Sequence, residues 1–147
     1  MNILLIDPSG VASYCLVDDL KNEGHTVFEA FNLNDAQSIW QDQSIGCIIS
    51  CVSLAPGMGG LTDKEREESK GRLLAGWVWL RNRVLSEKPD MRHRIILFSG
   101  SLRKLKEHIP EEELIDILLI SKRETSGAIE KVLEKIKTIK ESLERKS

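Results

Sequence analysis

Five short apolar runs alternate along the chain with stretches whose apolar residues recur at helical spacing. The runs occupy residues 3–6, 25–30, 45–51, 95–98 and 115–120. Four of them consist mainly of Ile, Leu and Val with little polar alternation, which is typical of strands buried on both faces of a parallel sheet. The pattern therefore predicts five parallel strands that helices cover on both sides.

The stretches between and after these runs have the spacing of amphipathic helices. They cover residues 11–22, a segment capped by Asn32 or Asn34, residues 73–85, residues 102–108, and a last helix over about 125–146. This alternation predicts an α/β protein with a three-layer, doubly wound, five-stranded parallel sheet. Such sheets bind ligands at the carboxyl ends of their strands. Here those ends carry Asp7, Cys51, Ser99 and Lys122.

Composition narrows the class of protein. The chain has 147 residues, 41% of them hydrophobic, which is the size of one domain with a substantial core. Its 21 basic and 23 acidic residues give a formal net charge of -2, so we expect no binding to nucleic acid or to an anionic membrane. Three cysteines are too few for a disulfide framework, and the first apolar run is too short for a signal peptide. We therefore expect a single domain, residues 1–147, in the cytoplasm.

Short motifs follow one another at the predicted strand ends. They are Ile3-Leu4-Leu5-Ile6-Asp7, Ile49-Ser50-Cys51-Val52-Ser53-Leu54 followed by Pro56-Gly57-Met58, Ile96-Leu97-Phe98-Ser99-Gly100, and Leu119-Ile120-Ser121-Lys122. In order and spacing they resemble the response-regulator receiver domain of the CheY-like type, over nearly the whole chain. The resemblance implies the flavodoxin-like (βα)5 fold, a place in two-component signal transduction or a phosphorelay, and a protein as partner.

Part of the phosphorylation chemistry that this resemblance implies is missing. A working receiver holds Mg²⁺ with an acidic pair after its first strand and an acceptor Asp after its third. Here Pro8 follows Asp7, so a hard cation loses one of its oxygen ligands. We expect no cofactor at this site, and Asp7 would be the ligand if Mg²⁺ were bound at all.

The acceptor position itself carries no carboxylate, because no Asp or Glu occurs between residues 42 and 63. It falls on Cys51 if Ala55 is an insertion, and on Val52 if it is not. Neither side chain can form an acyl phosphate. Cys51 either packs as a small apolar residue or forms a thiolate whose pKa Lys122 lowers. Cys47, four residues earlier on the same predicted strand face, brings no His or acid that would complete a metal site.

The retained residues Ser99 and Lys122 allow two interpretations. In an active receiver they would hold the phosphoryl oxygens. Without an acceptor, Lys122 would pair with Asp7 and leave a neutral site. Leu119 stands where receivers usually carry an aromatic switch residue, and Arg123 replaces the proline that normally follows the lysine. These two losses favour the second interpretation.

Two segments exceed the receiver pattern. Residues 61–72 are densely charged, and we expect a mobile surface loop, with a lid or a docking segment as the alternative. The last helix has apolar residues at heptad spacing, namely Ile129, Val132, Ile136, Ile139 and Leu143. We expect its first half to pack on the sheet, and Ile139 and Leu143 to be candidates for a homodimer or partner contact.

Trp77 and Trp79 lie two residues apart on a predicted helix, so their side chains leave it in different directions. We expect one of them in the core. The other is either exposed, as a candidate interface residue because aromatic side chains anchor protein contacts, or covered by the long charged segment.

The sequence thus predicts a pseudo-receiver that acts by protein–protein interaction, without conventional Asp phosphorylation and without enzymatic activity. An alternative is a stand-alone response regulator that is modified at Cys51, Ser50 or Ser53. A small flavodoxin-like enzyme is not supported, because no glycine-rich phosphate-binding motif follows Asp7. A cysteine phosphatase is not supported either, because no cysteine has an Arg at the spacing that its signature requires.

Overall fold

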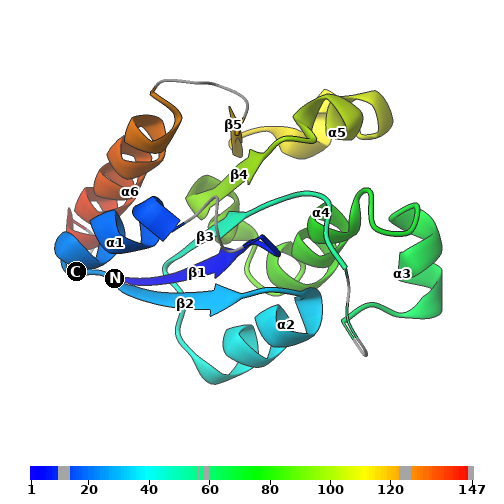
Figure 1. The fold of residues 1–147 in the computed structure, drawn as a ribbon, viewed down its shortest axis with the longest axis horizontal. Coiled ribbons are helices and arrows are strands. Elements are labelled where there is room, and N and C mark those ends of the chain that lie inside the picture. The colour runs from blue at the N-terminus through cyan, green and yellow to red at the C-terminus, as the bar shows by residue number, and fades with distance from the viewer. Residues whose placement is uncertain (10–13, 56, 58–59, 123–126, 146–147) are drawn as a thin grey trace.

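The predicted strands form a single parallel sheet (Figure 1). The computed structural model describes residues 1–9, 14–55, 57, 60–122 and 127–145. Its strands are β1 (Asn2–Ile6), β2 (Thr26–Ala30), β3 (Cys47–Ser50), β4 (Ile95–Ser99) and β5 (Leu118–Ser121), in the spatial order β2-β1-β3-β4-β5. In register, Ile6 pairs with Ala30 on one side and Ser50 on the other. The strand order reverses between β1 and β3, as a doubly wound sheet requires.

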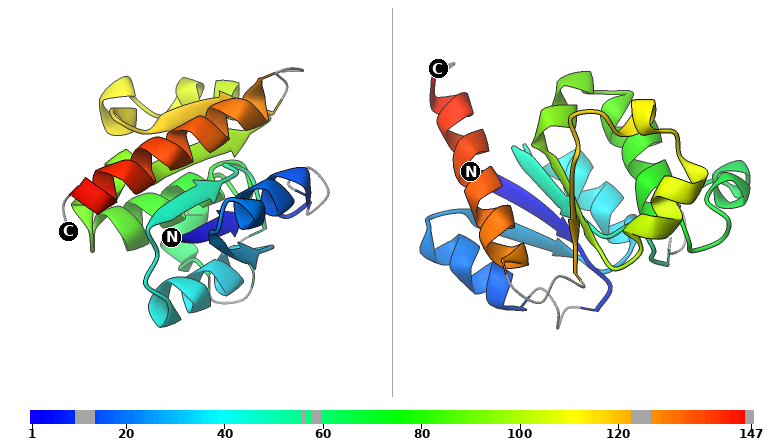
Figure 2. Two further views of the ribbon diagram at one scale, coloured as in Figure 1. Left: turned by 90° about the vertical axis from the view of Figure 1, so that its left-hand side faces the viewer. Right: turned by 90° about the horizontal axis from the view of Figure 1, so that it is seen from above.

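Helices cover both faces of this sheet (Figures 1 and 2). They are α1 (Tyr14–Asn22), α2 (Leu33–Asp42), α3 (Asp63–Glu68), α4 (Ala75–Trp79), α5 (Leu102–His108) and α6 (Ala128–Arg145). A π-helical segment, η1 (Leu80–Leu85), continues α4, and 3₁₀ turns η2 (Pro89–Arg94) and η3 (Glu111–Leu114) precede β4 and β5. The α1 and α6 helices pack on one face, and α2, α4 and α5 on the other.

The apolar side chains of the strands form two hydrophobic clusters, one on each face of the sheet. Along β1, Ile3 and Leu5 join the cluster under α1 and α6, whereas Leu4 and Ile6 join the cluster under α2 and α4. All four side chains are at most 2% exposed. Alternate residues of a strand point to opposite faces, so a strand covered on both sides must be apolar throughout. This confirms the three-layer α/β architecture.

The helix boundaries follow local signals in the sequence. The Asn32 side chain accepts a hydrogen bond from the Asp35 amide at 2.8 Å and so caps α2, as one of the two predicted alternatives. The α5 helix spans the predicted residues. The predicted starts of the first and last helices, at residues 11 and 125, lie outside the described residues. Among the described helices, none is both long and apolar enough to cross a bilayer.

Residues 61–72 contain a helix where a loop was expected, so the loop part of that prediction was wrong. They contain α3, which begins with a capping box between Thr62 and Glu65. The charge of the segment is accommodated because only Glu65 and Ser69 turn inward among its polar residues, while its neighbours stay in water. In Figures 1 and 2, α3 lies on the outer side of α4, far from α1 and α6.

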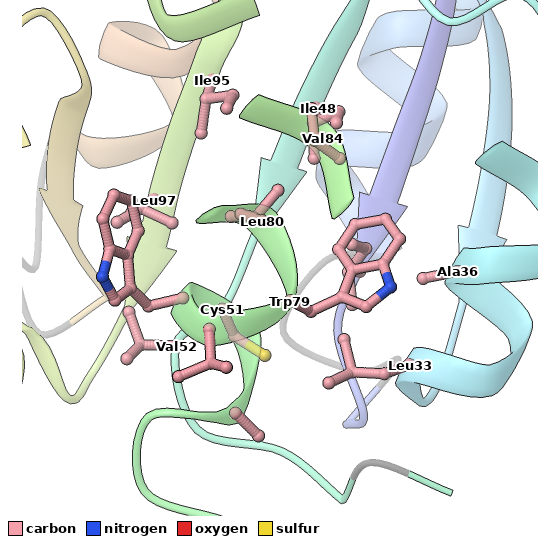
Figure 3. Close-up of a cluster of buried hydrophobic side chains, with 14 of the residues drawn as sticks. Leu33, Ala36, Ile48, Cys51, Val52, Trp79, Leu80, Val84, Ile95 and Leu97 are labelled. Atoms are coloured by element: carbon pink, nitrogen blue, oxygen red, sulfur yellow. The ribbon is translucent and has the colours of Figure 1, made fainter. Parts of the chain in front are cut away.

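Both tryptophans of α4 are buried, so of the two alternatives for the second one the exposed position was wrong and the covered position holds. Both Trp77 and Trp79 have an exposed fraction of 0%, and every residue of α4 is buried. Figure 3 shows the Trp79 indole directed at Leu33 and Ala36 of α2. Its Nε1–H donates to Gln37 Oε1 at 2.9 Å. Because helices flank α4 and α3 covers it from outside, neither tryptophan can serve as a surface contact in this conformation.

The heptad pattern of α6 is satisfied within the chain. Val132, Ile136 and Ile139 are buried in the cluster beneath α1 and α6, and Leu143 packs partly against the same cluster. Ile139 is only 4% exposed, so its assignment to a dimer interface was wrong. Met1 also packs partly against this cluster.

Candidate functional site

The carboxyl ends of four strands bring together the residues that the sequence singled out. Asp7 follows β1, Cys51 follows β3, Ser99 ends β4 and Lys122 follows β5. The parallel register sets these ends side by side, since Ile6 is paired with Ser50 and Ser99 with Ser121. The site therefore lies next to the reversal of strand order, where α/β sheets bind their ligands.

A direct ion pair occupies the centre of the site. Lys122 Nζ lies 2.5 Å from Asp7 Oδ2, and the exposed fractions of the two side chains are 21% and 4%. The other carboxylate oxygen of Asp7 accepts hydrogen bonds from the Ser9 amide at 2.9 Å and the Ser9 hydroxyl at 2.8 Å. Both Asp7 oxygens are thus already engaged by residues of the chain. The ammonium also lies 5.6 Å from the centre of the Phe98 ring.

The protonation state of Asp7 follows from these contacts. Burial works to raise the pKa of the Asp7 carboxyl, but the hydrogen bonds from Lys122 and Ser9 outweigh it. The pKa therefore lies below its ordinary value. Asp7 remains ionised at neutral pH and neutralises Lys122, which confirms the predicted pairing.

The Ser99 hydroxyl forms hydrogen bonds with backbone amides that follow β3 and β4. Its hydroxyl oxygen accepts hydrogen bonds from the Ser101 amide at 3.1 Å and from the Val52 amide at 3.4 Å. The Ser99 carbonyl accepts a hydrogen bond from the Lys122 amide at 3.1 Å. These bonds tie the residue after Cys51 to β4 and β5.

Cys51 is a packing residue in this structure. It is 5% exposed and belongs to the hydrophobic cluster beneath α2 and α4 (Figure 3). Burial, together with the charge of Asp7, raises the pKa of its thiol to about 12 despite the opposing effect of Lys122. The interpretation of Cys51 as a thiolate was therefore wrong, because desolvation outweighs the nearby cation.

Cys47 cannot assist Cys51, although the two were predicted to share a strand face. Cys47 lies in the cluster on the opposite side of the sheet, under α1 and α6. Regular alternation of side chains applies only within β3, which ends at Ser50, one residue before Cys51. Within the described residues, no group of three or more His, Cys, Asp or Glu side chains could hold a metal ion.

The segment after β3 is fixed by α4 and by the inserted residues. The Gly76 amide donates to the Val52 carbonyl at 2.8 Å, and the Leu54 amide donates to the Arg72 carbonyl at 3.1 Å. A Cβ atom on Gly76 would come within 2.4 Å of the Cys51 carbonyl oxygen, so only glycine permits this approach. Further along, Arg66 Nη2 donates to the Gly57 carbonyl at 2.9 Å.

A second buried ion pair, which sequence reasoning missed, joins the insertion to the helix behind it. Arg83 of η1 binds both carboxylate oxygens of Glu65, each at 2.5 Å. Asn82 donates to the same carboxylate at 2.8 Å, and the Thr62 amide donates to it at 2.9 Å. The hydrogen bonds from Arg83 are the main reason that the pKa of Glu65 falls to about 2. The sequence signal was available in the capping box Thr62-x-x-Glu65.

The similarity of this chain to known proteins is found in its structure. The sequence matches no family model and no curated protein. The structure is similar to the signal receiver domain of an HD domain-containing protein from Pseudomonas fluorescens Pf-5, with 20% identity and a TM-score of 0.65 over 96% of this chain and 94% of that one. The chain has the receiver-domain fold.

Other solved receiver domains agree with this assignment. The response regulator TrrA from Thermotoga maritima, solved in complex with Mg(2+)-BeF, has 17% identity and a TM-score of 0.61 over 94% of this chain and 97% of that one. The non-phosphorylated HemR receiver domain from Leptospira biflexa has 13% identity and a TM-score of 0.63 over 94% and 92%. Identities this low establish the receiver-domain fold and leave the activity to be argued from the site.

Proposed function

We propose that this chain is a signalling domain of the two-component type that works in the cytoplasm through contact with a partner protein, without phosphorylation of an aspartate. The observation that carries this proposal is the Lys122–Asp7 ion pair next to a strand end that is followed by Cys51 and Val52, neither of which carries a carboxylate. In this pair the Lys122 ammonium and the Asp7 carboxylate neutralise each other. No aspartate carboxylate is present there to form an acyl phosphate with an incoming phosphoryl group.

The Asp7 environment also disfavours Mg²⁺. A magnesium ion needs oxygen ligands close to octahedral geometry and sheds its water reluctantly. Here Pro8 offers no side-chain oxygen, and Asp7 already accepts three hydrogen bonds from Ser9 and Lys122. TrrA was solved with Mg(2+)-BeF, which makes it a suitable reference for the measurement.

The alternative, a regulator modified at an unconventional residue, gains no support from the contacts of Cys51 and Ser50. The thiol of Cys51 is buried, and its pKa is raised to about 12. The hydroxyl of Ser50 has an exposed fraction of 0% and donates to the Cys51 carbonyl at 2.7 Å. We therefore place the function in binding rather than in covalent chemistry.

The experiment is incubation of the whole chain with acetyl phosphate and Mg²⁺, followed by intact mass spectrometry. We expect no mass change, whereas TrrA treated in parallel serves as the reference response regulator. A gain of one phosphoryl group on this chain would overturn the proposal. Single variants Cys51→Ala, Ser50→Ala and Ser53→Ala would then locate the modified side chain.

A further inference from the structure

A cavity lies between η2 and the C-terminal half of α6, at the amino ends of β3 and β4. Its volume is about 330 Å³, within the roughly 300–1,000 Å³ that small-molecule sites occupy. Its lining includes two residues of η2 and three that follow one another at i,i+4 spacing on one face of α6, namely Asp90, Arg94, Lys135, Ile139 and Leu143. Asp7 and Lys122 follow the carboxyl ends of their strands, so the cavity lies at the opposite edge of the sheet.

Two cationic side chains converge on this cavity, one from each wall. Arg94 is the last residue of η2, and Lys135 is a partly buried residue of α6. Both lie close enough to the buried Cys47 thiol for their charges to lower its pKa, although burial still raises that pKa to about 12. Because Cys47 begins β3, both positive charges act at the same end of the sheet.

Acidic residues balance only one of these two charges. Asp90, the acidic residue of the lining, accepts a hydrogen bond from Arg94 Nη2 at 3.0 Å, and Arg94 Nη1 donates to the Gly46 carbonyl at 3.4 Å. A guanidinium has five N–H donors, so Arg94 has donors left for a ligand. Within the part of the chain that the structure describes, Lys135 forms neither a hydrogen bond nor an ion pair. The cavity therefore has a surplus positive charge.

The cavity also offers an apolar surface beside that charge. Ile139 is buried in the cluster beneath α1 and α6, and Leu143 packs partly against the same cluster. A ligand with an apolar body gains free energy here, because it removes apolar surface from water. Thr138 and Ser142 also line the cavity and are exposed, so a ligand can enter from solvent.

We propose that this cavity binds a small organic acid with an apolar body of one or two rings. The rings lie on Ile139 and Leu143, and the acidic group lies between Arg94 and Lys135. A single surplus positive charge matches a carboxylate better than a phosphate monoester, which carries about −1.5 to −2 charges at neutral pH. The inference goes beyond the proposed function and does not depend on it, because the cavity is separate from the Asp7–Lys122 pair.

The test is a titration of the ¹⁵N-labelled chain, followed by NMR, with three naphthalene derivatives that are substituted at the same ring position. These are naphthoate, its neutral carboxamide and naphthyl phosphate. We expect saturable shifts of the amide signals of Arg94, Lys135 and Leu143 with naphthoate. The carboxamide should bind at least about fivefold more weakly, because it lacks the charge that the cations attract. The phosphate should bind no more tightly than naphthoate.

Matched variants locate the site. Lys135→Met and Lys137→Met remove the same charge from neighbouring positions of α6, but Lys137 is exposed and does not line the cavity. We expect Lys135→Met to weaken naphthoate binding about fivefold, as the loss of one partly exposed charged contact should, and Lys137→Met to leave it within about twofold. Lys135→Arg keeps the charge and should retain binding.

Several results would overturn the inference. They are the absence of saturable shifts in the wild type, equal affinities for naphthoate and its carboxamide, tighter binding of the phosphate, and equal effects of Lys135→Met and Lys137→Met. A cooperative thermal transition of each variant shows that it folds, which is expected because Lys135 has no described partner to lose. Intact mass after acetyl phosphate treatment tests the proposed function separately, so the two failures are distinguishable.

Discussion

Two ion pairs of the chain have a buried carboxylate and a partly exposed cation, and they differ in what holds them. In the first, Asp7 meets Lys122 through one short contact, and Ser9 takes the other carboxylate oxygen. In the second, Arg83 donates to both carboxylate oxygens of Glu65, and Asn82 and the Thr62 amide donate to the same carboxylate. The side chains of the two carboxylates are 4% and 9% exposed.

The two pairs differ in whether the sheet positions their residues or the pair itself holds a segment in place. The Asp7–Lys122 pair joins the ends of two strands whose positions the sheet already fixes. The Glu65–Arg83 pair instead creates the position of α3, because the residues of that helix have no apolar side chains with which to pack. The first pair therefore fills an existing site, and the second holds a segment in place. Their removal should have different effects.

The largest effect is expected from Arg83→Met. The substitution keeps much of the side-chain volume but leaves the Glu65 carboxylate without the partly exposed Arg83 that binds both its oxygens, and the loss of these charged hydrogen bonds costs about 2–3 kcal/mol. Urea denaturation should show this loss in the free energy of unfolding. The matched control is Arg81→Met, which removes the exposed pair with Glu68 and should cost at most about 1 kcal/mol. Equal losses in the two variants would remove the distinction between the pairs.

A loss of similar origin is expected in acid. The folded state lowers the pKa of Glu65 from 4.5 to about 2, so the stabilisation is fully present above pH 4.5 and is lost as the pH falls towards 2. It amounts to about 3 kcal/mol. Asp7, whose pKa is also lowered, contributes in the same direction. Unfolding free energies of wild type and Glu65→Gln should therefore converge between pH 4.5 and 2, and parallel curves would contradict this origin.

The smallest effect is expected from Asp7→Asn, at about 1–2 kcal/mol. Lys122 is one-fifth exposed and can turn its ammonium towards water when its partner is neutralised. The reciprocal variant Lys122→Met should cost more, because it leaves the deeply buried Asp7 carboxylate unpaired. Thermal unfolding of both variants at pH 7 measures the difference. If Asp7→Asn lowered the unfolding free energy as much as Arg83→Met does, the two pairs would contribute equally to stability and the distinction would be wrong.

The sheet and its candidate site could be predicted because each depends on a local pattern. Runs such as Ile3–Ile6 are apolar without alternation, and a parallel sheet is the structure that buries both faces of such a strand. Once five such strands are aligned, Asp7 and Lys122 must meet at their carboxyl ends. No long-range information beyond the fold is needed for that pair.

The insertion could not be predicted in the same way, because its structure depends on a residue of another helix. Residues 63–68 are all charged, and burial of Glu65 is favourable mainly because Arg83 binds its carboxylate. A clue lay in the run from Leu73 to Leu80, which is apolar on every side and therefore needs a cover on every side. Trp77 and Trp79 are both buried, in line with the alternative in which the charged segment covers the second tryptophan.

The central claim is that the Asp7–Lys122 pair fills the site where a receiver of the usual kind would bind a divalent cation. A titration of the ¹⁵N-labelled chain with MgCl₂, followed by NMR, tests this claim most directly, with Pro8→Asp/Cys51→Asp as the variant that restores two carboxylates. The account predicts that the amide signals of Asp7, Cys51 and Lys122 stay in place in the wild type and shift only in the variant. Saturable shifts of these signals in the wild type would contradict it.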